Sequence, residues 1–421
     1  MRSDTNDNYL YVNDVSKFNP VKAGETIRIE SEQIRILSVD EKLNRLNVQR
    51  GVDGTEAANH NIDQEIYLFH DDAFGWRFFS VIFGTACIPV FFFICRRLKM
   101  SANISLLATF LFALDDMYFV HSSLALLDIY MLFFMLLGIL FYLQKGYLLS
   151  GMTFAISALC KTTGVFGFIA VLLHWLIFRQ DKPLWKSILK MFASIFAAAI
   201  TYLSFDILFE YFIQGKLVDP IRRSIDMLKA NAANVFTVPP LSISSRPWEW
   251  VLPWKIIVYA YGAAPEPQYI SFISWTIQLL IIPIFIYLCI KSKIYLRFKP
   301  KIQFVFEPQK GNPVAQFALI WFIISYLTWI PLTLITNRVT YVFYFLPTTG
   351  AMCIGIALAI KDIVGKCQRR TLIYGRKTKG IRAMYVGLAI YLLLHLAIFV
   401  IFNPNFPTII KFWLPPFLSP S

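Results

Sequence analysis

The N-terminal part of the chain and the remainder follow two different hydrophobic patterns. Near the start, apolar and polar residues alternate with period two over four short stretches that glycine or asparagine separates. Such alternation is typical of antiparallel strands with one face in water. We therefore predict a small antiparallel β module over 1–72, with His60 and His70 at its surface. The alternating stretches are 26–30, 33–39, 45–50 and 65–69.

From Phe74 onward, long apolar stretches recur instead. Most of them approach the ~20 residues with which an α-helix crosses ~30 Å of hydrocarbon. We predict that 73–421 forms one all-α, polytopic transmembrane bundle of about 10 spans with a long loop at 213–268. The expected spans are 75–95, 101–115, 122–143, 147–160, 162–178, 188–212, 269–290, 314–336, 340–360 and 383–402.

Composition supports a membrane protein. Hydrophobic residues make up 57% of the chain and charged residues 16%, against ~45–50% and ~25% in soluble domains. A soluble or disordered protein is thereby excluded. The six cysteines contain no CxxC pair, and we interpret them as small buried hydrophobes rather than as metal ligands or disulfides. They are Cys87, Cys95, Cys160, Cys289, Cys353 and Cys367.

The net charge of +14 is unevenly distributed. More than half of the 40 basic residues fall in alternate loops, and loops rich in Lys and Arg stay in the cytoplasm. This rule puts the β module, a turn at 115–122, Lys161, the 213–268 loop and Arg338 on the extracytoplasmic side. The positive charge then serves topology and membrane lipids, and we expect no nucleic-acid partner. The basic loops are 96–99, 145, 179–190, 291–310 and 361–382.

One acidic constellation is the strongest candidate for chemistry. Asp115 and Asp116 end one predicted span, His121 follows, and Asp128 lies inside the next apolar run. Carboxylates within a span are costly and commonly functional, so Asp128 requires a buried partner. Asp115 and Asp116 are equally compatible with capping a helix in contact with water.

Three further polar groups lie at predicted outer ends of spans. Lys161 separates two apolar halves, Arg338 ends a span, and an outer-loop segment carries Arg246, Trp248 and Glu249. The simpler alternatives are a snorkelling lysine, a helix-end arginine and an aromatic belt. No GxGxxG, GxxxxGK[ST] or HExxH motif is present, so a transferase would need a membrane-borne donor.

Five segments resemble the dolichyl-phosphate-mannose protein O-mannosyltransferase family, in family order. Residues 75–84 resemble its "GWR…G" opening, and 115–128 resemble its "D…fv.sr…LD" segment. Residues 159–164 are similar to "lsK.tg", 246–250 to "PW.W" and 341–347 to "Y.FlP". The outer loop is too short for a MIR domain, so the resemblance is nearest to archaeal or bacterial members.

The resemblance implies a GT-C membrane glycosyltransferase fold. The donor would be a polyprenyl (dolichyl) phosphate sugar, usually mannose, and the acceptor a Ser or Thr hydroxyl of a protein. The family's first span and its first-loop catalytic Asp with "HPPLgK" have no counterpart before Gly75, and Ser123 replaces the "sR" arginine. We therefore expect an incomplete reading frame, a split enzyme or a divergent member. No organic cofactor is expected, whereas a divalent cation (Mg²⁺ or Mn²⁺) and oligomerisation stay open.

Our leading hypothesis is a multi-pass cell-membrane sugar transferase with its active site on the extracytoplasmic face. Asp115, Asp116 and His121 would line the site and Asp128 would orient the loop, with Asp115 or Asp116 as the general base. Lys161 and Arg338 would hold the donor phosphate. The alternatives are a GT-C transferase that modifies a lipid or glycan, a non-catalytic family member and, less favoured, a transporter.

Overall fold

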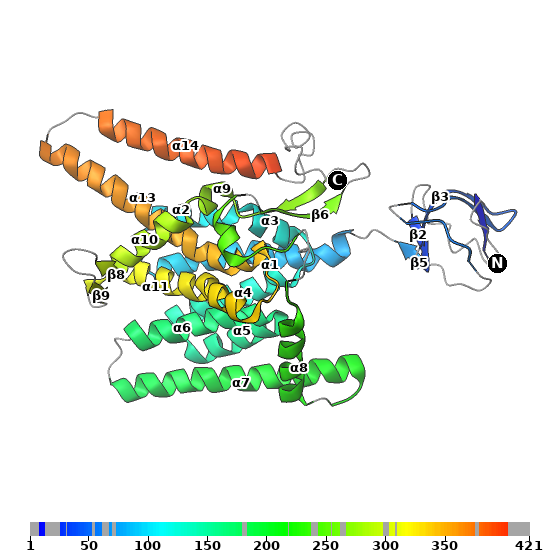
Figure 1. Cartoon of the computed structure of the whole chain (residues 1–421), viewed down its shortest axis with the longest axis horizontal. Helices are drawn as coiled ribbons and strands as arrows, with labels where there is room; N and C mark the ends of the chain where they lie inside the picture. Colours follow the sequence, from blue (N-terminus) through cyan, green and yellow to red (C-terminus); the bar gives the residue numbers. More distant parts are fainter. Residues whose placement is uncertain are drawn as a thin grey trace. The chain divides into compact units, whose positions relative to one another are not determined.

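The computed structural model divides the chain into two compact units, Met1–Trp76 and Arg77–Ser421. Each unit is described below by itself. The structure describes residues 8–12, 26–30, 32–52, 55–60, 67–69, 73–178, 183–217, 219–236, 243–253, 255–261, 267–297, 303–307, 310–374 and 379–402 (Figure 1).

The N-terminal unit contains a five-stranded antiparallel sheet in the order β1-β4-β3-β2-β5. The four stretches predicted from alternation correspond to β2 to β5, whereas the three-residue β1 is too short to show a period. His70 lies outside the described residues. The strands are β1 (Tyr9–Tyr11), β2 (Thr26–Ile29), β3 (Glu32–Asp40), β4 (Arg45–Gln49) and β5 (Tyr67–Phe69).

One face of this sheet forms a hydrophobic core. Alternate residues of β1 to β4 are buried, while their neighbours in sequence lie partly or fully exposed. The burial pattern confirms the period-two reading, because successive strand side chains point to opposite faces. The core residues are Leu10, Val12, Ile27, Ile29, Ile34, Ile36, Leu46 and Val48.

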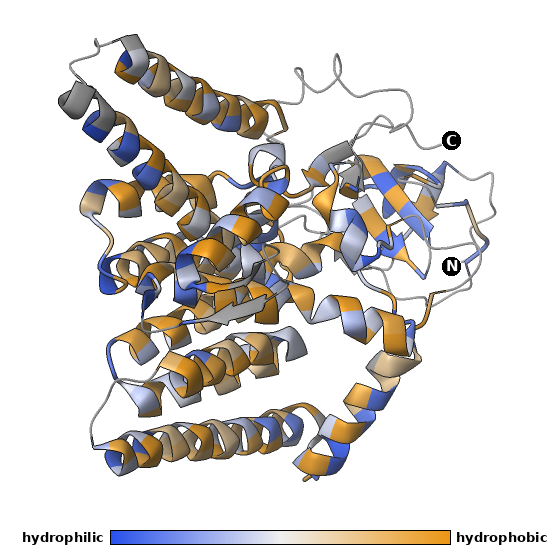
Figure 2. Ribbon diagram, turned by 60° about the vertical axis from the view of Figure 1, so that its left-hand side comes forward, coloured by the Kyte–Doolittle hydropathy of each residue, from blue (hydrophilic) through white to orange (hydrophobic). Residues whose placement is uncertain are grey.

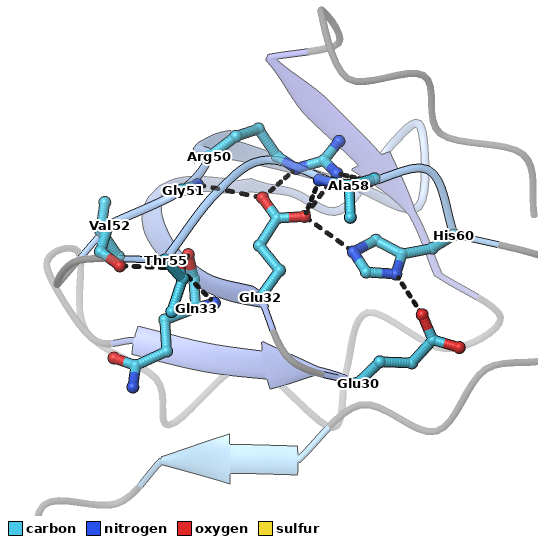
Figure 3. Close-up of polar contacts among 9 residues, drawn as sticks. All are labelled: Glu30, Glu32, Gln33, Arg50, Gly51, Val52, Thr55, Ala58 and His60. Carbon is cyan, nitrogen blue, oxygen red and sulfur yellow. Dashed lines mark hydrogen bonds and ion pairs between the residues drawn. The ribbon is translucent and has the colours of Figure 1, made fainter.

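A buried polar network ties a loop to the start of β3 (Figure 3). Glu32 accepts two bonds of 2.7 Å from Arg50 and bonds of 3.0 Å from the Gly51 and Ala58 amides. His60 Nε2 lies 2.7 Å from the same carboxylate, and His60 is 5% exposed, so its predicted surface position is wrong. Burial by itself raises the pKa of Glu32, but the four hydrogen-bonding groups together lower it to about 2.

The larger unit is a bundle of apolar helices, predominantly hydrophobic along their lengths (Figure 2). Within the described residues, five helical segments are long and apolar enough to cross a membrane, or six if the bent pair α2–α3 is one span. The helices are α1 (Ala73–Arg97), α2 (Ala102–Ala113), α3 (Asp116–Ser123), α4 (Leu127–Leu143), α5 (Tyr147–Cys160), α6 (Val165–Phe178), α7 (Leu184–Gln214), α8 (Pro220–Ala233), α9 (Trp275–Gln278), α10 (Ile281–Ser292), α11 (Pro313–Phe322), α12 (Trp329–Thr336), α13 (Leu346–Tyr374) and α14 (Lys379–Phe402).

The predicted polytopic helical class with a small N-terminal sheet is confirmed. Several predicted spans are nevertheless shorter apolar helices of 10–17 residues, namely α4, α5, α10 and the segment 162–178. All six cysteines are free, and Cys87, Cys95 and Cys353 are buried, as their apolar surroundings indicated. Short segments complete the unit: η2 (Thr162–Gly164), η3 (Pro247–Val251), η5 (Ile323–Leu327) and η6 (Val342–Phe345), with hairpins β6 (Ile257–Tyr261)–β7 (Pro267–Ser271) and β8 (Ile294–Arg297)–β9 (Gln303–Phe306).

Two sequence predictions about elements are wrong. The expected span 269–290 is broken into the end of β7, the short α9 and α10. Polar side chains explain the break: Ser274 binds the acidic segment near Asp116, and Gln278 donates to the backbone carbonyls of Trp250 and Leu252. The expected turn at 115–122 is instead the helix α3, which Asp115 caps at its N-terminus.

Close helix packing in the bundle uses small residues. A Cβ added at Gly151 of α5 would lie 2.0 Å from the Ser194 carbonyl oxygen of α7, so only glycine permits this approach. Such contacts are typical of membrane helices, where van der Waals packing replaces the hydrophobic effect as the source of association. The pair α5–α7 thereby fixes one wall of the region described next.

Candidate functional site

The partner of Asp128 is the half-buried Lys161. Asp128 lies in the first turn of α4, and Lys161 is the extended residue between α5 and η2. Lys161 Nζ donates to Asp128 Oδ1 over 2.6 Å, with the two side chains 21% and 8% exposed. The sequence identified both residues as costly charges, and the structure joins them, although 32 residues separate them in the chain.

His121 extends this ion pair into a polar cluster. It is fully buried on α3, its Nε2 lies 3.1 Å from the Tyr259 hydroxyl of β6, and its Nδ1 lies 3.8 Å from Asp128 Oδ2. Within the described residues, this Nδ1 atom has no hydrogen-bond partner. A buried nitrogen in this state is costly, and it is available to a group that enters the cluster.

Lys161 and Arg338 lie on opposite ends of one aromatic stack. Lys161 Nζ is 4.5 Å from the Phe343 ring centroid and 5.3 Å from that of Tyr344. Tyr344 stacks on Trp329 at 4.6 Å, and the Arg338 guanidinium lies 5.8 Å from the Trp329 centroid. The two predicted cations thus converge on one region of the molecule, where cation–π contacts help to hold them.

A largely apolar cavity of about 530 Å³ adjoins this stack between α6, α7, α8 and α12. Arg338 lines it, and so does Thr163, whose buried hydroxyl has no hydrogen-bond partner within the described residues. The cavity therefore combines a hydrocarbon-like wall with a cation and a hydroxyl group. Its lining is Ala158, Thr162, Thr163, Val165, Phe166, Tyr202, Ser224, Met227, Leu228, Ala232, Trp329, Leu332, Thr336 and Arg338.

Asp115 and Asp116 bind Ser274 rather than Lys161 or Asp128. Asp115 accepts from the Ser274 amide over 2.9 Å and from the Tyr118 amide over 3.2 Å. Asp116 Oδ2 accepts from the Ser274 hydroxyl over 3.1 Å, and both aspartates are buried. Asp115 therefore caps a helix, as the simpler alternative predicted, but burial of both aspartates contradicts the predicted contact with water, and the pair fixes α3 against the segment before α9.

The outer-loop segment forms a local turn. The Arg246 amide donates to Glu249 Oε2 over 2.7 Å in a capping box at η3. The Arg246 guanidinium lies 4.4 Å from the Phe236 ring centroid and 5.5 Å from that of Trp248, and it donates to Asn337 Oδ1 over 3.4 Å. These contacts hold the loop segment beside Arg338, and none of them involves Asp128.

One polar cluster escaped the sequence analysis. Asp206 and Glu210 lie one turn apart on the membrane-length helix α7, and Arg223 of α8 binds both. The sequence did contain a signal for this cluster, because two acidic residues four positions apart stand out in an apolar run. Tyr259 and Thr163 gave no comparable signal, because hydroxyl residues are common in loops and at helix ends.

The structure offers little for a metal ion in the described ranges. No group of three His, Cys, Asp or Glu side chains lies close enough there to hold one. The divalent cation stays a prediction.

Comparisons with known proteins point to the membrane glycosyltransferases. The family model described as dolichyl-phosphate-mannose-protein mannosyltransferase matches residues 51–214. The sequence resemblance is thus confirmed over the stretch that holds Asp115, Asp116, His121, Asp128 and Lys161. The segments at 246–250 and 341–347 lie beyond the match.

A search of solved structures matches the chain to the apo oligosaccharyltransferase of Archaeoglobus fulgidus. The likeness covers 77% of this chain and 45% of that one, with 13% sequence identity and a TM-score of 0.37. The chain thus spans less than half the length of that protein. A search of curated proteins found no match.

Proposed function

We propose that the protein is a membrane glycosyltransferase that moves a sugar, in the first instance mannose, from a polyprenyl phosphate to Ser or Thr hydroxyls of proteins. The observation that carries the proposal is that the family match covers Asp128 and Lys161, which form a partly buried ion pair beside a cavity. Charged side chains within a membrane bundle cost free energy, and such residues commonly serve binding or catalysis.

The cavity supports a prenyl phosphate as the donor. Its apolar wall suits the first isoprene units, and Arg338 offers a planar fork for phosphate oxygens. The unpartnered Thr163 hydroxyl is available as a further hydrogen-bond donor to phosphate or sugar. Lys161 does not line the cavity, but it contacts Tyr344, which stacks on the cavity residue Trp329.

Geometry favours Asp128 over Asp115 and Asp116 as the general base. A base must lie within hydrogen-bond reach of the hydroxyl it deprotonates, about 2.6–3.2 Å. Asp115 and Asp116 are bound to Ser274, whereas Asp128 shares a cluster with the partly exposed Lys161. In this scheme Asp115 and Asp116 position α3, and with it His121.

The reaction would proceed by direct displacement. The acceptor hydroxyl gives its proton to the Asp128 carboxylate while its oxygen bonds to the anomeric carbon of the sugar. The bond from that carbon to the phosphate oxygen breaks, and its electron pair leaves on the phosphate with inversion at the sugar. Protonation of Asp128 leaves the Lys161 charge unbalanced, and the departing phosphate anion restores the balance.

Transfer of radiolabelled mannose from a polyprenyl phosphate donor by the purified protein tests the proposal. Label in an acceptor protein supports it, whereas label in lipid or glycan would make the protein a transferase with another acceptor. Absence of any product, from a preparation whose helical content and thermal unfolding show a folded protein, would overturn the proposal.

We further propose that the Asp128–Lys161 end of the bundle faces the extracytoplasmic side, because the basic loops belong to the opposite end. In a background without native cysteines, Cys substituted for the exposed Lys229 should react with an impermeant thiol reagent added outside, and Cys substituted for Lys310 should not. The reverse labelling pattern would invert the orientation.

A further inference from the structure

Helix α8 forms one wall of the candidate donor cavity. It runs across α7 rather than along it (Figure 1). Ser224, Met227, Leu228 and Ala232 of α8 line the cavity. Ile221 and Ile225 of the same helix are exposed apolar residues. Contacts with α7 and with the segment around Arg338 attach this wall to the bundle.

The first attachment is a charged clamp. Arg223 Nη2 lies 2.6 Å from Glu210 Oε1, and Arg223 Nη1 donates to Asp206 Oδ1. Asp206 and Glu210 are only 2% and 4% exposed, so one guanidinium pairs with two buried carboxylates of α7. Removing the partner of a buried charge is much costlier than removing an exposed ion pair. A hydrogen bond of 3.2 Å between Tyr202 and Ser224 reinforces the clamp.

The second attachment leads directly to Arg338. Val235, just after α8, forms an antiparallel bridge with Arg338. The Val339 amide donates to the Asn234 carbonyl over 2.9 Å, and the Phe236 amide donates to the Asn337 carbonyl over 2.9 Å. The backbone that carries the cavity cation is therefore paired with the chain that leaves α8. A shift of α8 would move both the cavity wall and Arg338.

We propose that Arg223 is a positioning residue for the donor, acting through Asp206 and Glu210 to fix α8 and thereby the wall and cation of the cavity. The proposal rests on the proposed function, since it assigns a role in binding the prenyl phosphate. Arg223 does not line the cavity, so its contribution is to donor affinity through α8 rather than to the bond-breaking step.

Arg223→Ala and its neighbour Arg222→Ala provide a matched test. Arg222 is exposed, and its variant removes the same charge without touching the clamp. We expect Arg223→Ala to raise the KM for the prenyl phosphate donor about tenfold or more while kcat changes less than about threefold. Amide hydrogen exchange over 220–236 should also accelerate in Arg223→Ala and stay unchanged in Arg222→Ala.

Two further variants distinguish loss of the clamp from misfolding of the protein. Arg223→Lys keeps a charge without the fork that reaches both carboxylates, so an intermediate KM is expected. The triple variant Asp206→Asn, Glu210→Gln, Arg223→Met contains no unpaired buried charge, and it should fold while still exchanging faster over 220–236. The proposal is wrong if the triple variant and Arg223→Ala both keep the wild-type hydrogen exchange and KM. It is also wrong if Arg222→Ala has the same effects as Arg223→Ala.

A binding readout separates this inference from the proposed function. Binding of a short-chain polyprenyl monophosphate to the purified, full-length protein can be measured without any transfer. If wild-type protein binds it and transfers no sugar, the proposed function fails and the positioning role is still tested by the weaker binding expected for Arg223→Ala. If Arg223→Ala binds it as wild type does, the positioning role fails whether or not transfer occurs.

Discussion

The two units each contain a buried carboxylate with a cation and a histidine, yet the two clusters differ in how completely they are bonded. Glu32 of the N-terminal unit accepts bonds from Arg50 and two backbone amides, with His60 at 2.7 Å (Figure 3). Asp128 of the membrane unit bonds to Lys161, while His121 Nδ1 lies 3.8 Å away and has no hydrogen-bond partner within the described residues.

This difference separates a structural cluster from a candidate reactive one. A carboxylate whose acceptor sites are all filled stabilises the fold and has no capacity for a substrate. A cluster with unpartnered polar atoms, here His121 Nδ1 and the Thr163 hydroxyl, carries a cost that binding of a ligand would relieve. Residue types alone would have given both clusters the same interpretation.

The largest expected effect is that of Asp128→Asn on transfer. The amide keeps the shape of the side chain but takes no proton, so the rate should fall by the ~10²–10⁴-fold that a general base contributes. Transfer of radiolabelled sugar at saturating donor measures it. Asp116→Asn is the matched control, since asparagine still accepts from the Ser274 hydroxyl.

The two variants together test which aspartate is the general base. If Asp116→Asn lowers the rate ~10²-fold or more while Asp128→Asn stays within about threefold of wild type, the base is Asp116 and the assignment of Asp128 is wrong. That outcome would also contradict the inference that the cluster with unpartnered polar atoms is the reactive one.

The second effect concerns the stability of the N-terminal unit. Glu32→Ala removes the carboxylate that pairs with the buried Arg50, and loss of one member of a buried pair costs ~3–5 kcal/mol. Protease susceptibility and hydrogen exchange over residues 26–60 should both rise steeply in the full-length protein. Glu41→Ala, at an exposed position, should leave both unchanged. A minor effect of Glu32→Ala would mean that the saturated network contributes little to this unit.

The third effect concerns the binding of the donor phosphate by Arg338. Charge-assisted hydrogen bonds contribute ~1.5–3 kcal/mol each, so Arg338→Ala should weaken use of the donor by about tenfold to a hundredfold. Arg338→Lys should recover part of this loss, because lysine supplies the charge without the fork. Donor titrations in detergent measure both. Unchanged apparent donor affinity in Arg338→Ala and in Lys161→Ala would exclude the phosphate role of this pair.

The smallest effect is a pH dependence of the stability of the N-terminal unit. The pKa of Glu32 is lowered from 4.5 to about 2, so the unit gains stability from the ionised carboxylate above pH 4.5. This gain should decline as the pH falls from about 4.5 to 2. Hydrogen exchange over residues 26–60 at graded pH, corrected for intrinsic rates, would show the decline. Glu32→Gln should flatten it, and an equal decline in that variant would assign it to other groups.

The sequence by itself determined the class of structure. Period-two alternation located β2 to β5, because strand side chains alternate between core and water, and apolar run lengths located most of the membrane helices. It also indicated that Asp128 is a costly charge, and it singled out Lys161 and Arg338 as candidate cations at the ends of spans. These properties are local, so they can be read from neighbouring residues.

Only the tertiary structure decided which of these charges meet. Lys161 neutralises Asp128, Ser274 binds Asp115 and Asp116, and Arg223 joins two acids of another helix. Ser274 even breaks a stretch that looked like one span, because its bonds to the aspartates outweigh continuation of the helix. A partner's identity depends on how distant segments pack, and a hydropathy pattern contains no information about the direction in which a buried polar group points.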